Sequence, residues 1–383
     1  MCDDMTIREA VIQKAMNSVD TYFECYNKDA GCDEGPGYWS ASVGSMFDCL
    51  QLLYDLSAGK INVFDNPLIR AMGEYVVDLN ISSKNYVNFA DASATLSLDG
   101  VLLREFGERC SSEVLYDFGN YSLVQKHYGA NHTSIYRALR SIYAKPLPKE
   151  ASVLKAKKSV YYEAIEVALF RKSEVRGDGL FLAMKGGNNG ENHSHDDVGC
   201  IIVHYENTPV LIDPGSGAYI NQAFEKRENS WQKYSDFHNL PIINGKVQAR
   251  GGQAHAENTV YTENSLSAEL KYAYPEDAGI ASYVREAIHG GDKIILNEKI
   301  SLNEEGEVDF VFTSAYEPTV NGASVNLAAN RVLTSENGIV PEIEVFHDEI
   351  TGAIKRWNPE TMNLYRIHFK TKTRKDVFTF TIQ

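Results

Sequence analysis

The arrangement of apolar residues changes once along this chain of 383 residues, near the segment Lys145-Pro146-Leu147-Pro148. Before this segment, apolar residues recur every three or four positions, as they do on one face of an α-helix. After it, they alternate with polar residues or form short continuous runs, which is typical of β-strands. The two prolines favour a linker, and the chain is long enough for two domains. We therefore expect one domain at residues 1–150 and a second at residues 151–383.

The first domain is predicted to be helical. Helical patterns cover the ranges 7–27, 40–57, 66–79, 94–106 and 134–143. In the first of them, apolar residues follow one another at four-residue steps, beginning with Ile7 and Val11. The glycine-rich loop 31–37 then ends this pattern, and Pro67 stands near a first helical turn, where proline is tolerated. Helices joined by short loops indicate an all-α array.

The second domain is predicted to be an antiparallel β-sandwich. Many short apolar or alternating segments are separated by turns rich in glycine, asparagine and aspartate, which is the pattern of such folds. The segments are 159–170, 180–185, 199–205, 293–300, 307–312 and 377–382. The fold class that we predict is therefore multidomain α+β, with a helical domain followed by a sandwich.

Composition excludes some partners. The formal net charge is −15, which argues against nucleic acid because phosphate binding needs a basic face. The negative net charge does not exclude an anionic substrate, because a local basic pocket could bind one. We see neither a signal peptide nor an apolar run of the about 20 residues that a transmembrane helix needs, so we expect no membrane association and a cytoplasmic chain.

The six cysteines are scattered without CxxC spacing, so a zinc ribbon or a thioredoxin-type motif is not expected. The simplest account is isolated buried thiols in a reducing compartment. They are Cys2, Cys25, Cys32, Cys49, Cys110 and Cys200.

Two of the ten histidines stand one residue apart, in the run Asn192-His193-Ser194-His195-Asp196-Asp197. If the run is an extended strand, residues i and i+2 point to the same face. His193 and His195 would then project side by side from one sheet surface, which suits a metal or acid–base site. A single histidine is more often a surface or core residue. The pair, flanked by these polar residues and preceded by the flexible stretch 185–190, favours a site.

The best metal-binding set in the sequence is His195, Asp213 and His238. Two imidazoles and one carboxylate are common ligands of zinc, with a fourth position for water or another ligand. His193 would then be available for chemistry beside the metal. Taken singly, Asp213 could instead be a turn residue before Pro214, and His238 a packed histidine.

A second constellation is the loop Asp33-Glu34-Gly35-Pro36-Gly37-Tyr38-Trp39. Its glycines allow an irregular backbone that would present Tyr38 and Trp39 at the start of a helix. A tyrosine moves a proton near neutral pH only when a neighbouring cation or metal lowers its pKa from about 10. The alternative is a capping loop with packed aromatic residues, and both interpretations stay open.

Together these segments resemble the heparinase II/III-like family of polysaccharide lyases. The order of the motifs matches over residues 30–290, and several separate motifs agree. The loop 34–39 resembles the tyrosine loop of that family. The other similar segments are Asn88-Phe89-Ala90-Asp91, Lys185-Gly186-Gly187, Asn192 to Gly199, Leu211 to Tyr219, His238 to Gly245 and Tyr272-Ala273-Tyr274-Pro275.

The resemblance implies a partial (α/α) toroid packed on an antiparallel β-sandwich, with the substrate cleft between them. It also implies β-elimination on an anionic, uronic-acid-containing glycan. By the matching positions, Tyr38 and His193 would be the catalytic residues. His195, Asp213 and His238 would hold a divalent metal, which is usually Zn²⁺ in this family. The oligomeric state is left open, with a dimer as one option.

The sequence departs from the family in its helical part. The resemblance implies an asparagine- or histidine-containing motif, on a helix well before the tyrosine loop, that neutralises the uronate carboxylate. Tyr38 lies too close to Met1 for that motif. We therefore expect an N-terminally truncated gene product or a reduced relative.

Two alternatives to a lyase follow from the same residues. A metallo-hydrolase would use the H-x-H-x-D pattern of His193, His195 and Asp197, but the histidine that normally comes next is replaced by Val198. A non-catalytic, metal-stabilised glycan-binding protein would have kept the metal site and lost turnover. The missing upstream motif is the feature that favours this second alternative.

Overall fold

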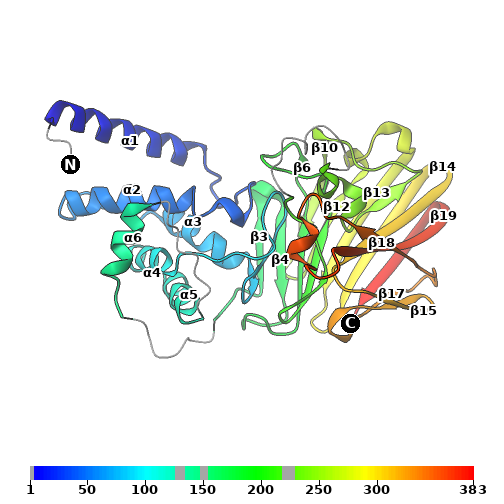
Figure 1. Ribbon diagram of the computed structural model, residues 1–383. Helices are drawn as coiled ribbons and strands as arrows, with labels where there is room; N and C mark the ends of the chain where they lie inside the picture. Colours follow the sequence, from blue (N-terminus) through cyan, green and yellow to red (C-terminus); the bar gives the residue numbers. More distant parts are fainter. Residues whose placement is uncertain (1–3, 126–133, 147–153, 218–228) are drawn as a thin grey trace. The chain divides into compact units, whose positions relative to one another are not determined.

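The structure is a computed structural model that describes residues 4–125, 134–146, 154–217 and 229–383. The chain forms two compact units (Figure 1). The helical unit contains Met1–Cys32, Tyr38–Val77 and Ser97–Leu154, and the sandwich unit contains Asp33–Gly37, Asp78–Leu96 and Lys155–Gln383. Two short segments from the first third of the chain therefore belong to the sandwich unit. Some of the predictions fall outside the described residues, namely those on Cys2, Leu147 and Pro148 of the predicted linker, the predicted boundary at 150 and Ala218-Tyr219.

The described part of the helical unit carries six α-helices (Figure 1). Asp4, Asp99, Ser112 and Ser134 each stand before a helix and accept hydrogen bonds from its first free backbone N–H groups. The helices are α1 Met5–Cys25, α2 Val43–Leu56, α3 Pro67–Asp78, α4 Gly100–Arg109, α5 Glu113–Val124 and α6 Ile135–Ile142.

The interior of this unit is aromatic. Phe47 stacks on Phe106 with ring centroids 4.5 Å apart, and Trp39 stacks on Phe106 from 6.2 Å. Helices α4 and α5 approach closely because Gly119 has no side chain: a Cβ there would lie 2.7 Å from the carbonyl oxygen of Gly100. Helix α1 contributes no buried residue to this interior.

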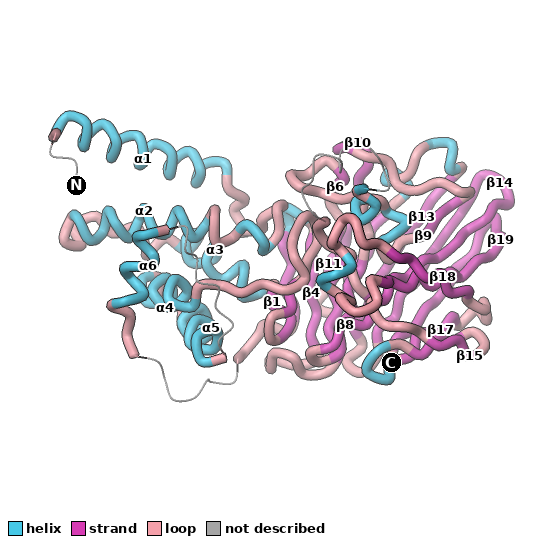
Figure 2. The backbone as a smooth tube through the Cα atoms, viewed as in Figure 1, coloured by secondary structure: helices cyan, strands magenta, loops and turns pink. Residues whose placement is uncertain are grey.

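The sandwich unit contains one ten-stranded and one five-stranded antiparallel sheet (Figure 2). The five-stranded sheet has the order β3-β4-β5-β7-β8, with β3 Ser159–Tyr162, β4 Val167–Arg171, β5 Leu180–Lys185, β7 Ile201–Tyr205 and β8 Thr208–Leu211. The ten-stranded sheet is built on β14 Ile294–Ser314 and β19 Asn363–Ile382. Its other strands are β9 Pro241–Ile243, β11 Glu257–Tyr261, β12 Ser265–Glu269, β13 Ile280–His289, β15 Thr319–Asn321, β16 Ser324–Asn326, β17 Val332–Ser335 and β18 Glu342–His347.

Two small two-stranded sheets complete the unit. Strand β6 Asn188–Asn189 pairs with β10 Gly251–His255, and β1 Asn80–Ser82 pairs with β2 Asn85–Tyr86. The main core lies between the two large sheets, since one cluster of buried side chains draws on both. Leu182 and Val203 come from the five-stranded sheet, whereas Leu296 and Phe310 come from the ten-stranded sheet.

The mixed α+β class and the sandwich-like sheets are as predicted. Helix α4 begins at Gly100 and not near Ala94, because Asp99 caps it. The predicted strand 159–170 is interrupted by a 3₁₀ turn at Glu163–Ile165, which ends in the left-handed residue Glu166. None of the described helices has the length and apolar character of a membrane span.

Candidate active site and metal centre

Asp213 is held at the end of β8. The backbone N–H of Ile212 donates to the carbonyl of Thr313 on β14 over 2.9 Å, which ties the end of β8 to the larger sheet. Gly215 donates its N–H to Asp213 Oδ1 over 2.8 Å, and Asn88 Nδ2 donates to the Asp213 carbonyl over 3.0 Å. Gly215 has φ +70°, and a Cβ there would lie 2.7 Å from Asn88 Nδ2. The turn after β8 therefore presents the Asp213 side chain in a fixed, fully buried position.

His238 reaches Asp213 from the segment before β9. Its Nδ1 lies 2.9 Å from Asp213 Oδ2, and its Nε2 lies 3.0 Å from the carbonyl oxygen of Gln232. The next residue, Asn239, donates from Nδ2 to the carbonyls of Ile201 and Ile212 over 2.7 and 2.9 Å. These bonds fix the backbone beside His238 against the strands that lead to Asp213.

His195 comes from the loop between β6 and β7, and its side chain is almost fully buried. Its Nε2 lies 3.1 Å from Asp91 Oδ1, so the natural tautomer carries the proton on Nε2 and donates it to that carboxylate. Its Nδ1 is buried and has no hydrogen-bond partner among the described residues. A buried ring nitrogen without a partner destabilises the folded state, because it has lost its hydrogen bond to water. A metal ion bound to this atom would remove that cost.

The structure brings His195, Asp213 and His238 together, with one potential ligand atom from each within 4.8 Å of the others. This is the one group of at least three histidine, cysteine or acidic side chains in the described residues that could hold a metal ion. The donors fit an ion of the zinc type: two imidazoles and one carboxylate, all buried, with the unsatisfied His195 Nδ1 among them.

Without an ion, the cluster is held by charge. Burial alone would lower the pKa of His238, but the charge of Asp213 and the hydrogen bond to it raise that pKa well above its usual value. Burial alone would raise the pKa of Asp213, but the charge and the hydrogen bond of His238 lower it. Both shifts favour a proton between His238 Nδ1 and Asp213 Oδ2, and a metal would take the place of that proton.

His193 is not on a strand, so the prediction that His193 and His195 project side by side from one face of an extended strand is wrong. His193 has φ +56° and lies in a turn. Its side chain nevertheless contacts the carboxylate of Asp91, as the side chain of His195 does. Its Nδ1 lies 3.1 Å from Asp91 Oδ2, and a third of the side chain (34%) is exposed. His193 thus combines a fixed ring with partial access to solvent, which a proton-transfer residue needs.

Asp91 joins the two histidines, and sequence reasoning assigned it no role. One oxygen contacts His195, and the other contacts His193 and, over 3.3 Å, the ammonium of Lys233. The carboxylate is only 2% exposed. A backbone bond of 2.9 Å from Asp196 to the carbonyl of Lys233 holds this lysine beside the histidine loop. The signal in the sequence was that Asp91 ends one of the family-like segments.

The stretch 185–190, which we expected to be flexible, is held by hydrogen bonds. Lys185 Nζ lies 2.7 Å from Asp197 Oδ1 in a fully buried ion pair. Gly186 and Gly187 donate their N–H groups to Glu166 over 2.7 and 2.9 Å. These bonds fix the start of the loop that carries His193 and His195.

Asp196 and Asp197 are each engaged by a basic side chain outside the metal-binding group. Asp196 pairs with Arg250 over 3.1 Å, and burial raises the pKa of this carboxyl to about 6 against the opposing charge of Arg250. Asp197 is engaged by Lys185. The structure therefore does not bring His193, His195 and Asp197 together, as an H-x-H-x-D metal site would require.

Tyr38 is the first residue of the second segment of the helical unit, and it is half-buried. The loop before it, Asp33–Gly37, belongs to the sandwich unit. There Asp33 Oδ2 accepts from Asn192 Nδ2 over 2.9 Å, and Cβ atoms placed on Gly35 and Gly37 would lie 3.2 and 3.4 Å from atoms of Ala92. The chain that leads into Tyr38 thus packs beside the neighbours of both His193 and Asp91.

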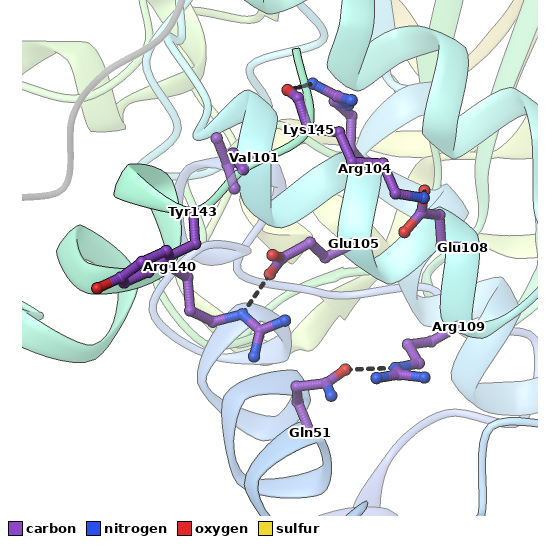
Figure 3. Close-up of a pocket in the computed structure, with 10 residues that line it drawn as sticks. Gln51, Val101, Arg104, Glu105, Glu108, Arg109, Arg140, Tyr143 and Lys145 are labelled. Atoms are coloured by element: carbon purple, nitrogen blue, oxygen red, sulfur yellow. Dashed lines mark hydrogen bonds and ion pairs between the residues drawn. The ribbon is translucent and has the colours of Figure 1, made fainter. Parts of the chain in front are cut away.

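The helical unit contains a separate cavity of about 280 Å³ (Figure 3). Three arginines reach it, but each is already engaged. Arg140 pairs with Glu105 over 2.6 Å, Arg109 donates to Gln51 over 2.7 Å, and Arg104 donates to the carbonyl of Lys145 over 3.0 Å. The three arginines of this cavity are therefore paired, whereas His195 Nδ1 has no partner among the described residues.

No protein-family model matches the sequence, and no curated protein matches it. Solved structures share its fold. A heparinase III superposes with a TM-score of 0.68 at 14% sequence identity, over 98% of this chain and 55% of that chain. Heparan sulfate lyase HepC from Pedobacter heparinus superposes with a TM-score of 0.66 at 12% identity, again over 98% and 55%. This chain therefore has a heparinase-like fold and spans about half the length of these structures.

Proposed function

We propose that this chain is a polysaccharide lyase that cleaves uronic-acid-containing glycans by β-elimination. The observation that carries the proposal is His193, a partly exposed histidine oriented by the buried Asp91 directly beside the group of His195, Asp213 and His238. The heparinase-like fold supports an anionic glycan as substrate, because its neighbours are named heparinase III and heparan sulfate lyase. We also propose that the helical unit is part of an (α/α) toroid.

The reaction needs a base and an acid. The proton on C5 of a uronate lies α to a carboxylate and becomes more acidic when the charge of that carboxylate is neutralised. A base removes this proton, and its electron pair forms the C4=C5 double bond. The C4–O bond then breaks, and an acid protonates the departing glycosidic oxygen.

His193 is the base in this proposal. Its Nδ1 lies 3.1 Å from Asp91 Oδ2, so in this proposal Nδ1–H donates to the carboxylate and Nε2 takes the proton from the substrate. Asp91 thereby fixes the tautomer and the direction of the ring, as the third group of a catalytic triad does. Since Asp91 is itself buried and bonded to His195 and Lys233, it is a firm support for that ring.

Tyr38 is the acid that we propose for the departing oxygen. The support is local: Asp33–Gly37, the residues directly before Tyr38, contact Asn192 and Ala92, which are the neighbours of His193 and Asp91. We further propose that Tyr38 takes the C5 proton from substrates of the opposite epimer, in which that proton lies on the other face of the sugar.

Lys233 is the cation that we propose for the uronate carboxylate. It shares Asp91 Oδ2 with His193 and its side chain is 23% exposed, so it combines a position beside the proposed base with partial access to solvent. This role would correspond to that of the asparagine- or histidine-containing motif that the resemblance implies.

His195, Asp213 and His238 would hold a divalent metal, for which Zn²⁺ is the best match to the donors. When bound, the ion supplies positive charge that satisfies Asp213 and joins the loop before β7, the turn after β8 and the segment before β9. The proton transfers belong to His193 and Tyr38.

A metal-stabilised protein that binds glycans without cleaving them is the alternative. It would use the same buried group of His195, Asp213 and His238 to hold its metal. Since an inactive binder would retain the buried cluster but release no product, turnover separates the two functions.

The test is a turnover assay with the full chain loaded with Zn²⁺. The unsaturated uronate that β-elimination creates absorbs ultraviolet light, so absorbance is followed with heparan sulfate, chondroitin, hyaluronan and alginate. We expect a rise with at least one glycan and its loss in His193→Ala. A matched control is His347→Gln, because His347 is an exposed histidine on β18 that takes no part in the site. No rise with any of the four glycans, or an unchanged rate in His193→Ala, would remove the support for the proposal.

A further inference from the structure

Cys200 lies against the His195, Asp213 and His238 group, although nothing in the sequence pattern marks it as a ligand. It stands between Gly199 and the first residue of β7 and is fully buried. Its Sγ lies 3.8 Å from Asp213 Oδ2 and 3.9 Å from His238 Nδ1. These are the same two atoms that face each other across 2.9 Å. The thiol therefore sits at the pair of atoms that a metal would separate.

The distances agree with a shared ion. In tetrahedral zinc sites the metal lies about 2.3 Å from sulfur and about 2.0 to 2.1 Å from nitrogen or oxygen, which puts the sulfur about 3.5 Å from each of the other ligand atoms. The two measured distances exceed this value by only a few tenths of an ångström. Cys200 is outside the group whose atoms lie within 4.8 Å of one another, so His195 or Cys200 would close the remaining gap by side-chain rotation.

A second observation points to the same ligand. Within the part of the chain that the structure describes, His195 Nδ1 is buried without a hydrogen-bond partner, whereas Nε2 of the same ring lies 3.1 Å from Asp91 Oδ1. A metal would satisfy this nitrogen. With His195, Asp213 and His238 as ligands, a tetrahedral metal ion would have one further position to fill.

The backbone on both sides of the thiol is fixed in place. Arg285 is buried and donates from Nη1 to the carbonyl of Gly199 over 2.8 Å and to that of Asn239 over 2.5 Å. Arg285 thus connects the backbone of Gly199, directly before Cys200, to the backbone of Asn239, directly after His238. Gly199 itself has φ +88°, and a Cβ there would lie 2.4 Å from Leu270 Cδ1. Cys200 is consequently presented to the cluster by a rigid frame.

We propose that Cys200 is the fourth ligand of the metal, so that the site is a closed tetrahedron of two imidazoles, one carboxylate and one thiolate. The inference rests on the metal site of the proposed function and does not depend on lyase activity. A thiolate ligand selects zinc over calcium or magnesium, and four protein ligands are the mark of a structural site. In this account the ion holds the loop that carries His193 and leaves the chemistry to that histidine.

The experiment uses the full chain, stripped of metal and then loaded with Co²⁺ or Zn²⁺. We expect wild-type protein with Co²⁺ to show a near-ultraviolet thiolate-to-cobalt charge-transfer band, and Cys200→Ser to lose that band. Cys200→Ser should also bind Zn²⁺ at least about tenfold more weakly, since even groups behind a ligand cost that much when removed. Cys110→Ser is the matched control, because Cys110 is a buried cysteine of the helical unit; its band and affinity should match wild type.

X-ray absorption at the zinc edge of wild-type protein keeps the proposal testable if Cys200→Ser does not fold. We expect one sulfur neighbour at about 2.3 Å, and a first shell of nitrogen and oxygen alone would overturn the assignment. An unchanged cobalt band in Cys200→Ser would overturn it equally. If wild-type protein binds neither ion, the metal site falls together with this inference, whereas the ultraviolet turnover assay decides the lyase proposal independently.

Discussion

Replacing Asp91 with asparagine tests the central contact of the site, because one carboxylate serves both His193 and His195. Its two oxygens lie 3.1 Å from His193 Nδ1 and 3.1 Å from His195 Nε2. Asparagine keeps one acceptor oxygen and places an NH₂ group in the position of the other. One of the two ring N–H groups must then face a donor, or its histidine must change tautomer.

The size of the effect follows from these contacts. A hydrogen bond to a charged group contributes about 1.5 to 3 kcal/mol, and the carboxylate is 2% exposed, so water cannot replace it. Loss of one such bond corresponds to about 10- to 150-fold in an equilibrium or rate constant. We expect Asp91→Asn to lower kcat at least about 10-fold. It should also weaken zinc binding about tenfold or more, because His195 loses the hydrogen bond that orients its ring.

Two measurements on the same protein check this coupling: kcat with the best glycan, and zinc affinity by competition with a chelating dye. His193→Ala should lose turnover and keep zinc, whereas Asp91→Asn should lose part of both. Asp309→Asn is the matched control, because Asp309 is a buried carboxylate that holds another histidine, His368 Nδ1, over 2.8 Å on the sandwich. If Asp91→Asn leaves both kcat and zinc affinity unchanged, the role that we assign to this carboxylate is wrong.

Three further predictions concern single residues. His195→Ala should weaken zinc binding at least about tenfold and lower Tm, and unchanged metal content by elemental analysis would contradict the ligand assignment. Tyr38→Phe should abolish turnover while Tm stays within about 2 °C, since only a hydroxyl on a half-buried ring is lost, and retained kcat would exclude Tyr38 as the acid. Burial lowers the pKa of His204 from 6.5 to about 3, so the unfolded chain takes up a proton below pH 6.5 that the folded chain does not, and stability falls with pH from 6.5 toward 3. At pH 5 this amounts to about 2 kcal/mol, and in denaturant unfolding His204→Leu should lose about that much less stability than wild type between pH 8 and pH 5; an equal loss in both would contradict it.

Local patterns predicted much of the secondary structure. The strand Leu180–Lys185 has the predicted bounds because its residues are all buried and form one unbroken run. Helix α5 was not predicted, since Gly119 interrupts its apolar pattern where α4 approaches it. A glycine that packing requires looks, in the sequence alone, like a helix breaker.

The site was predictable where residue types alone define the chemistry. His195, Asp213 and His238 were grouped as donors, and the structure brings them together. The strand geometry for His193 was wrong, because the backbone there turns with positive φ. Asp91 received no role because its contact with His193 spans 102 residues, and no local pattern reports a contact of that range.

The most direct test of the account is the mass of the products formed from a defined uronate-containing oligosaccharide by the zinc-loaded chain. A β-elimination splits the substrate without adding water, so the product masses sum to that of the substrate and one product carries the unsaturated uronate. Hydrolysis adds one water, and a binding protein leaves the oligosaccharide intact. We predict the first result with wild-type protein and uncleaved substrate with His193→Ala. Products that contain an added water, or no products from heparan sulfate, chondroitin, hyaluronan and alginate oligosaccharides, would contradict the proposed function.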